Sequence, residues 1–177
     1  SRIEARKYFN IDDDKLVLLF TGFIKPYKGI PELIECFKKI FSGNAILVIA
    51  GKVMNAEYFA TVKKSINENI ILVDRFIENE ELQLYFNASD VVVLPFKKIE
   101  NSGSVILAMG FKKPIIAPKM GALIERLKNQ NELLYEESVE ESFNVLKGMT
   151  STKLLEIGEN NFSELDKYKW CDFAKAF

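Results

Sequence analysis

The stretch K-L-V-L-L-F-T-G-F-I-K-P-Y-K-G-I-P-E-L-I-E-C-F-K-K-I, residues 15–40, decides the fold. It begins with a continuous apolar run, residues 15–20, which is typical of a strand buried on both faces. Gly22 follows that run, and Pro31 stands near a helix start, where proline is tolerated. Apolar residues then recur at helical spacing as far as Ile40. The stretch therefore predicts a strand, a loop and a helix.

The same alternation of strand and helix repeats along the chain. Further strands are expected at residues 45–50, 69–73, 91–95, 114–117 and 132–135. Helices are expected at residues 56–66, from 79 onward, at 103–111, at 121–128 and from 139 to the end. Strands that alternate with helices indicate a parallel sheet covered on both sides. We therefore expect one domain over residues 1–177, an α/β, Rossmann-like, doubly wound parallel sheet of about six strands flanked by helices.

The composition is typical of a globular protein that builds a sizeable core, with 48% hydrophobic residues. The net charge of −1 gives no global field that would attract nucleic acid or an acidic membrane. No apolar run reaches the length of a membrane span, and residues 1–6 lack the apolar core of a signal peptide. Cys36 and Cys171 lack metal-ligand spacing, so we expect reduced thiols in a cytoplasmic protein.

The chain contains no histidine. This excludes the Ser-His-Asp and Cys-His nucleophile systems and most zinc sites. Acid–base chemistry would have to use carboxylates, lysine, tyrosine, the substrate or a group from another domain. The acidic run at residues 12–14 precedes the first strand, opposite the expected ligand site, and is interpreted as a turn rather than a metal site.

Ligands of doubly wound sheets bind beyond the carboxyl ends of the strands. After the first strand, Gly22 allows a turn, and Lys25 and Lys28 suit a pyrophosphate. The alternative is a solvated loop with two surface lysines. After the third strand, Phe76 and Ile77 could flank a nucleotide base. Alternatively, they cover the sheet edge and pack against the next helix.

The loop after the fourth strand ends in I-E-N-S-G-S, residues 99–104. If Asn101 or Ser102 caps a helix that starts near Gly103, free main-chain N–H groups point into the ligand crevice. Ser104 adds a hydroxyl, and Gly103 lets a ligand approach the backbone. The alternative is an ordinary Ser/Gly helix cap.

In their order along the chain, these loops resemble the motifs of a known family. Four segments show this resemblance: G-F-I-K-P-Y-K-G-I-P-E-L-I-E-C-F (22–37), L-V-I-A-G (47–51), R-F-I-E-N-E-E-L-Q-L-Y-F-N-A-S-D-V-V-V-L-P (75–95) and S-G-S-V-I-L-A-M-G-F-K-K-P-I-I-A (102–117). They look like the C-terminal, donor-binding half of GT-B glycosyltransferases of retaining family four, the glycosyl transferases group 1. The match covers essentially the whole chain, and its most specific part is residues 75–95.

The resemblance implies transfer of a sugar from a nucleotide-diphosphate donor to an acceptor, with retention at the anomeric carbon. It implies that this chain is a single nucleotide-sugar-binding domain, inactive by itself, without the N-terminal acceptor domain. The acceptor would be a glycan, a lipid or a polysaccharide intermediate bound through that missing half, which could also contact a membrane peripherally. No nucleic acid partner, no cofactor and no metal are expected.

The resemblance also assigns roles to residues. Lys28 matches the lysine that contacts the donor phosphates, and Lys25 looks like its basic partner, because Phe23 occupies the place of the usual arginine. Both lysines and the helix start near Ser104 would stabilise the charge on the leaving phosphate without a metal. The donor-binding set is Gly22, Lys25, Lys28, Phe76, Ile77, Glu100, Asn101, Ser102, Gly103 and Ser104.

One departure from the family concerns its pair of glutamates, since Ile99 and Leu107 occupy those positions. Glu100 lies one place out of register and, with Asn101 and Ser102, would orient the donor sugar. Glu100 thus joins Lys25 and Lys28 as the expected catalytic set. The rivals are an epimerase or phosphorylase of the same architecture and a non-catalytic nucleotide-sugar-binding module. A flavodoxin-like signalling domain is disfavoured, because the first strand does not end in acids.

Overall fold

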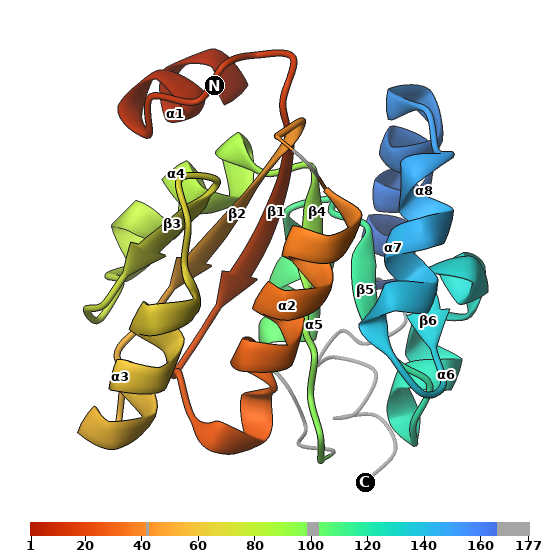
Figure 1. Ribbon diagram of the computed structural model, residues 1–177. Helices are drawn as coiled ribbons and strands as arrows, with labels where there is room; N and C mark the ends of the chain where they lie inside the picture. Colours follow the sequence, from red (N-terminus) through yellow and green to blue (C-terminus); the bar gives the residue numbers. More distant parts are fainter. Residues whose placement is uncertain (42, 99–102, 166–177) are drawn as a thin grey trace, which may run out of the picture.

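The computed structural model describes residues 1–41, 43–98 and 103–165. Within that part of the chain, six strands form one parallel sheet in the order β3-β2-β1-β4-β5-β6 (Figure 1). The strands are β1 (Leu16–Thr21), β2 (Ala45–Ala50), β3 (Ile70–Val73), β4 (Val91–Val93), β5 (Ile115–Pro118) and β6 (Leu134–Tyr135). The order runs outward from β1 in both directions. This confirms the doubly wound, Rossmann-like fold predicted from the alternating pattern.

Helices cover both faces of the sheet (Figure 1). The α-helices are α1 (Arg2–Tyr8), α2 (Ile30–Ile40), α3 (Ala56–Ser65), α4 (Asn79–Ala88), α5 (Gly103–Gly110), α6 (Ala122–Arg126), α7 (Val139–Lys147) and α8 (Ser151–Glu164). Two 3₁₀ segments, η1 (Pro26–Lys28) and η2 (Lys128–Leu133), complete the set. None of the helices in these described ranges is both long and apolar enough to cross a bilayer.

Alternate residues of β1 pack into two separate hydrophobic cores, one on each face of the sheet. Leu18 and Phe20 belong to the core under α2 and α7, whereas Val17 and Leu19 belong to the core under α4 and α5. All four side chains are fully buried. Because successive strand residues point to opposite faces, a strand buried on both sides must be apolar throughout. This explains the continuous apolar run that predicted the strand.

Three local expectations differ from the structure. The helix α1 was not predicted, although Ser1 and Glu4 form a capping box at its start. The helix expected at residues 121–128 ends at Arg126, and η2 follows and shortens the expected last strand to two residues. The helical region from Val139 divides into α7 and α8, because Thr150 caps a second helix through the N–H of Lys153.

Arg6 ties the amino edge of the sheet together, and its side chain is buried. It donates to the main-chain oxygens of Ala88, Asp12, Asp13 and Lys15 and to Asp90 Oδ2, at 2.8 to 3.2 Å. Burial lowers the pKa of Arg6, and the charge of Asp90 opposes that effect. The acidic run at residues 12–14 is therefore a turn whose carbonyls bind Arg6. Within the described ranges, no three Asp, Glu or Cys side chains group as metal ligands.

Gln130 continues the hydrogen bonding of β5 at Ile115, beyond Ala117 and Pro118, the two residues of β5 that pair with β6. Its side-chain amide donates to the carbonyl of Ile115 at 2.6 Å, and its Oε1 accepts from the N–H of Ile115 at 3.0 Å. Asn161 of α8 donates to the same Oε1 at 2.9 Å. Gln130 is buried and so takes the place of a neighbouring strand.

Candidate functional site

The loops that follow β1, β2 and β3 are joined to one another by hydrogen bonds at the carboxyl edge of the sheet. The N–H of Gly22 donates to Ala50 at 3.1 Å, and the N–H of Ile24 donates to Lys52 at 3.0 Å. One strand further on, Asp74 Oδ1 accepts from the N–H of Val53 at 2.9 Å. This edge is therefore ordered beyond the strands themselves, in the place where doubly wound sheets bind ligands.

Two glycines allow these loops to approach more closely than any side chain would permit. A Cβ on Gly51, where φ is 153°, would lie 1.9 Å from the carbonyl oxygen of Gly22. A Cβ on Gly29, where φ is 67°, would lie 2.5 Å from the carbonyl oxygen of Pro95. Both conformations also favour glycine, whatever the space. The loops after β1, β2 and β4 are consequently in backbone contact.

The two lysines of the first loop lie among aromatic rings. Lys28 closes η1, and its Nζ lies 4.0 Å from the ring centroid of Phe96 and 5.1 Å from that of Tyr27. Lys25 Nζ lies 5.5 Å from the ring centroid of Phe23 and 5.7 Å from that of Tyr27. Both lysines are half-buried. Their positive charges are thus gathered in one aromatic-lined loop rather than spread over a solvated surface.

The start of α5 adjoins this loop. The Cβ position of Gly22 lies only 3.7 Å from Ser104 Oγ. Helix α5 begins at Gly103, as the sequence predicted, and Gly103 is exposed with open space around its Cβ position. The first N–H groups of a helix lack partners within the helix and attract anions. The residues expected to cap α5 and orient the sugar, Glu100, Asn101 and Ser102, lie outside the described residues, as does Ile99.

The loop after β3 separates the two neighbouring residues assigned to the base. The side chain of Phe76 is 54% exposed, whereas that of Ile77 is 7% exposed and packs in the core with Leu82. Ile77 precedes the N-cap of α4 and Leu82 is its fourth residue, which is the arrangement of a hydrophobic staple. The exposed ring of Phe76 is therefore the side chain that this loop offers to a ligand.

Arg75 and Glu81 hold that loop rigid. Two Arg75 nitrogens donate to the two carboxylate oxygens of Glu81 at 2.6 Å each, and one of them also reaches the carbonyl of Phe76 at 3.2 Å. This hydrogen bonding raises the pKa of Arg75 and lowers that of Glu81. A bidentate pair of this kind fixes geometry as well as charge.

The structure places Gly22 beside Ser104 at the start of α5 and Lys28 beside Phe96 in the loop after β4, and Lys25 lies on the same loop as Gly22 and Lys28. Phe76 lies on the same edge, two strands away after β3. Leu107, at the family's second glutamate position, packs against the core under α5 and offers no polar group.

The sequence did not predict Phe96 as a neighbour of Lys28, nor the pairing of the loop after β4 with α2. Phe96 lies in the loop after β4, three positions beyond Val93, and Lys97 forms an ion pair with Glu32 of α2. These three residues help to line a groove of about 320 Å³ at the carboxyl ends of β4, β5 and β6. An aromatic residue immediately after a strand-ending proline was the available signal for Phe96.

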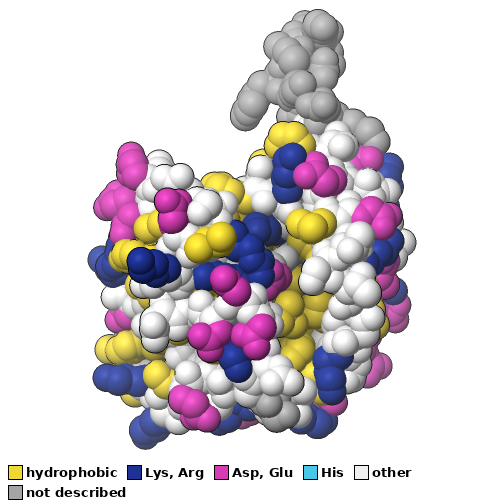
Figure 2. All heavy atoms as spheres, turned by 90° about the horizontal axis from the view of Figure 1, so that it is seen from above, with side chains coloured by type: hydrophobic (Ala, Val, Ile, Leu, Met, Phe, Trp, Pro, Cys, Tyr) yellow, Lys and Arg dark blue, Asp and Glu magenta, His cyan; other side chains and the backbone are white. Residues whose placement is uncertain are grey.

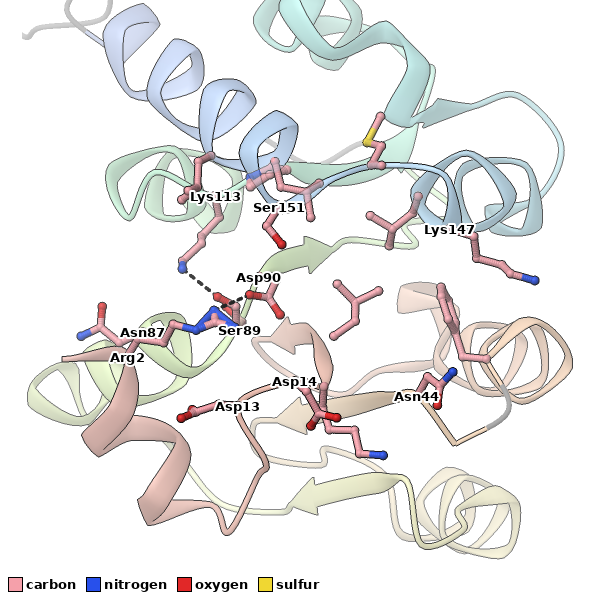
Figure 3. A pocket seen from close by; sticks show the side chains of 18 of the residues that line it. Arg2, Asp13, Asp14, Asn44, Asn87, Ser89, Asp90, Lys113, Lys147 and Ser151 are labelled. Atoms are coloured by element: carbon pink, nitrogen blue, oxygen red, sulfur yellow. Dashed lines mark hydrogen bonds and ion pairs between the residues drawn. The ribbon is translucent and has the colours of Figure 1, made fainter.

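A larger groove of about 960 Å³ lies at the opposite, amino edge of the sheet. Figure 2 looks onto this edge and shows basic side chains beside a hydrophobic hollow. The close-up shows Lys113 bonded to Ser89, whose carbonyl oxygen lies 2.7 Å from its Nζ (Figure 3). Arg2 pairs with Asp90 at 2.6 Å. These contacts connect α1 and the loop before β5 to the segment between α4 and β4. Because doubly wound sheets bind ligands beyond the carboxyl ends of their strands, the carboxyl edge is the candidate site.

Comparison with known proteins identifies the family. The family model described as glycosyl transferases group 1 matches residues 1–147. The chain therefore belongs to the glycosyl transferases group 1, and the resemblance read from its motifs is confirmed. Its structural neighbours are GT-B glycosyltransferases, so the fold is confirmed as one half of that architecture.

Individual relatives agree with this assignment. A GDP-mannose:glycolipid 4-beta-D-mannosyltransferase of Xanthomonas campestris is 29% identical over 103 residues, which are 57% of this chain and 30% of that protein. The chain thus spans about a third of that relative's length. An Anabaena protein in complex with UDP and glucose has a TM-score of 0.81 at 17% identity, covering 93% of this chain and 47% of that one.

A third relative matches along nearly its whole length. It is the C-terminal domain of a group 1 glycosyl transferase from Francisella tularensis. Its TM-score is 0.76 at 23% identity, and the match covers 96% of this chain and 93% of that one. The fold of the present chain therefore also exists as a domain crystallised by itself.

Proposed function

We propose that this chain is the donor-binding half of a retaining glycosyltransferase and holds a nucleoside-diphosphate sugar at the carboxyl edge of its sheet. The observation that carries the proposal is the meeting of the Lys25–Lys28 loop with the start of α5. The loop carries two ammonium groups, and at Gly22 it lies against Ser104 in the first turn of α5. A pyrophosphate needs this combination of cations and main-chain N–H groups.

The chemistry of transfer follows from electrostatics. Departure of a nucleoside diphosphate builds negative charge on its distal phosphate. Lys25, Lys28 and the N–H groups of the first turn of α5 stabilise that charge, and the proposal requires no metal ion or other cofactor. Glu100, with Asn101 and Ser102, orients the donor sugar in this scheme.

The base of the nucleotide rests against the loop after β3. Phe76 presents its exposed ring for stacking, and Ile77 contributes through its main chain, because its side chain is in the core. The similar proteins include a GDP-mannose enzyme and a protein in complex with UDP, so both bases are candidates.

The acceptor belongs to the part of the enzyme that this chain does not include. The proposed acceptor is a glycan, a lipid or a polysaccharide intermediate, as the glycolipid acceptor named for the Xanthomonas relative suggests. It binds through the N-terminal half, which is also where a peripheral membrane contact would lie. The proposal places the whole enzyme in the cytoplasm, and the isolated 177-residue chain binds donor without transferring sugar.

Ligand-induced stabilisation tests donor binding directly. The melting temperature of the 177-residue chain is measured with UDP, GDP, ADP, dTDP and CMP, each at increasing concentration. Binding stabilises the folded state by mass action, roughly 2.7 kcal/mol at a hundred times Kd, so the preferred nucleotide raises the melting temperature most. Lys28→Ala should reduce the rise at a given nucleotide concentration, whereas Lys147→Ala, at an exposed lysine at the amino edge, should not. If no nucleotide shifts the wild-type chain, the donor site is refuted.

Kinetics of the full-length enzyme test the role of Lys28. Removing one contact to the developing charge costs about 2–4 kcal/mol of transition-state stabilisation, which is roughly 30- to 1,000-fold in kcat. Lys28→Ala should therefore reduce acceptor-dependent release of nucleotide by that factor while the melting temperature changes little. Unchanged turnover would show that Lys28 does not contact the reacting phosphate.

Leu107 supports a second candidate function, a nucleotide-sugar-binding module without transferase activity. Its apolar side chain packs against the core where catalytic members carry a glutamate. Donor binding without sugar transfer by the full-length protein, over a panel of acceptors, would favour this candidate.

A further inference from the structure

Phe96 combines burial with a charged neighbour. It follows Pro95 in the loop after β4, and its side chain is only 4% exposed. The ammonium group of Lys28 nevertheless lies 4.0 Å from the centroid of its ring. This distance is well within the range at which an aromatic face attracts a cation.

The ring of Phe96 is held in place from several directions. The N–H of Phe96 donates to Leu94 at 2.8 Å, and the N–H of Lys97 donates to Tyr27 at 3.0 Å. The ion pair of Lys97 with Glu32 joins the same loop to α2. The approach of Gly29 to Pro95, described above, fixes the spacing between the two loops. The backbone that carries the ring is therefore fixed against the first loop, and the ring itself is buried.

A lysine side chain is flexible, and ordering it at a ligand costs conformational entropy. Attraction to a fixed, partly desolvated ring restricts the ammonium group before a ligand arrives, which lowers the cost of binding. The ring covers one side of the ammonium group and excludes water there. A phosphate oxygen would approach from another side and meet a charge that water screens less.

We propose that Phe96 is a positioning residue that places the Lys28 ammonium group for the diphosphate of the ligand. The inference rests on the proposed function, because it assumes that Lys28 meets a phosphate. It predicts that the electron density of the ring, and not only its size, sets the affinity for a nucleoside diphosphate.

Stepwise fluorination of the ring tests this prediction. Phe96 is replaced by 4-fluoro-, 3,5-difluoro- and 3,4,5-trifluorophenylalanine in the 177-residue chain, and binding of GDP and UDP is measured by calorimetry. Each fluorine weakens the attraction for a cation while the ring keeps nearly its size. Affinity should fall stepwise across the series, and Phe96→Leu, which lacks the ring, should weaken binding about five- to thirtyfold.

Two controls separate positioning from structure. The same fluorinated residues at Phe86, a buried ring stacked on Phe111 at 4.4 Å, should leave affinity unchanged. In a Lys28→Ala background, fluorination of Phe96 should also have no effect, because the cation that the ring attracts is gone. A second readout is the ¹³C–¹H signal of the Lys28 ε-methylene, which the ring current of Phe96 should move upfield and which Phe96→Leu should return to its ordinary position.

The outcomes distinguish the inference from the function on which it rests. Equal affinity across the fluorinated series, in a chain that binds nucleotide and whose binding Lys28→Ala weakens, would overturn the role of Phe96 and leave the proposed function intact. An ordinary chemical shift for the Lys28 ε-methylene would also overturn it. If the wild-type chain binds neither GDP nor UDP, both the function and the inference fail.

Discussion

Replacing Arg6 by methionine should destabilise the fold without altering the candidate site. Methionine keeps much of the apolar stem of arginine but removes the guanidinium group, which donates to four main-chain carbonyls and to Asp90. Breaking a buried ion pair by removing one partner costs about 3–5 kcal/mol. Asp90 keeps its bonds to Arg2 and to the N–H of Val17, so the lower end of that range, about 3 kcal/mol, is expected.

Urea unfolding of the 177-residue chain, followed by circular dichroism, measures this effect. The midpoint should fall while the slope with denaturant stays constant, because the surface exposed on unfolding does not change. Arg2→Met is the matched control, since Arg2 pairs with the same Asp90 but its side chain is 46% exposed. An exposed ion pair contributes at most about 1 kcal/mol, so the control should stay near wild type.

If Arg6→Met lowers the free energy of unfolding no more than Arg2→Met does, the buried guanidinium group of Arg6 does not stabilise the fold as proposed. The folded fraction of Arg6→Met should also bind nucleotide with wild-type affinity, because Arg6 acts at the amino edge and the candidate site lies at the carboxyl edge. A lower affinity in the fully folded variant would show that the two edges are coupled.

Two further predictions concern stability. Gly158→Ala should cost about 1–3 kcal/mol of unfolding free energy, because its Cβ would lie 2.0 Å from the carbonyl oxygen of Lys112. Gly110→Ala is the control and should be neutral or slightly stabilising, because its Cβ would have no neighbour closer than 4.0 Å. Equal losses of stability in the two variants would contradict the steric argument. Burial lowers the pKa of Lys113 from 10.5 to about 8 in the folded chain. Between pH 8 and 10.5, Lys113 is therefore protonated in the unfolded chain but mostly neutral in the folded chain. The unfolding free energy of the wild-type chain should therefore rise between pH 8 and 10.5 relative to Lys113→Met, and parallel pH curves for the two proteins would count against this.

The strands and the layered fold could be predicted because their signal is local. A strand buried on both faces needs an unbroken apolar run, and β1 and β2 each show one. The roles of Arg6 and Gln130 could not be predicted, because both side chains bond to main-chain groups of segments that only the fold brings near. Gln130 in particular lies in a polar stretch whose sequence indicates nothing of its burial.

The candidate site shows the same division. The lysines and glycines of the first loop were predicted because they follow a strand at the ligand-binding edge. For Phe76 and Ile77 the sequence left a base contact and a hydrophobic staple open. In the structure, Ile77 is buried and forms the hydrophobic staple, whereas the ring of Phe76 is exposed. Phe96 was missed because its importance arises from a contact with Lys28, on a loop 68 positions earlier in the chain.

The side chain of Gln130 has a consequence for how this sheet ends. An N–H and a C=O that face outward from the last full strand are the groups onto which a strand of another molecule can add. The side chain of Gln130 forms hydrogen bonds with both of these groups at Ile115, a part of β5 that the two-residue strand β6 does not reach. Its amide thereby leaves neither main-chain group of Ile115 open for pairing with a strand of a neighbouring copy.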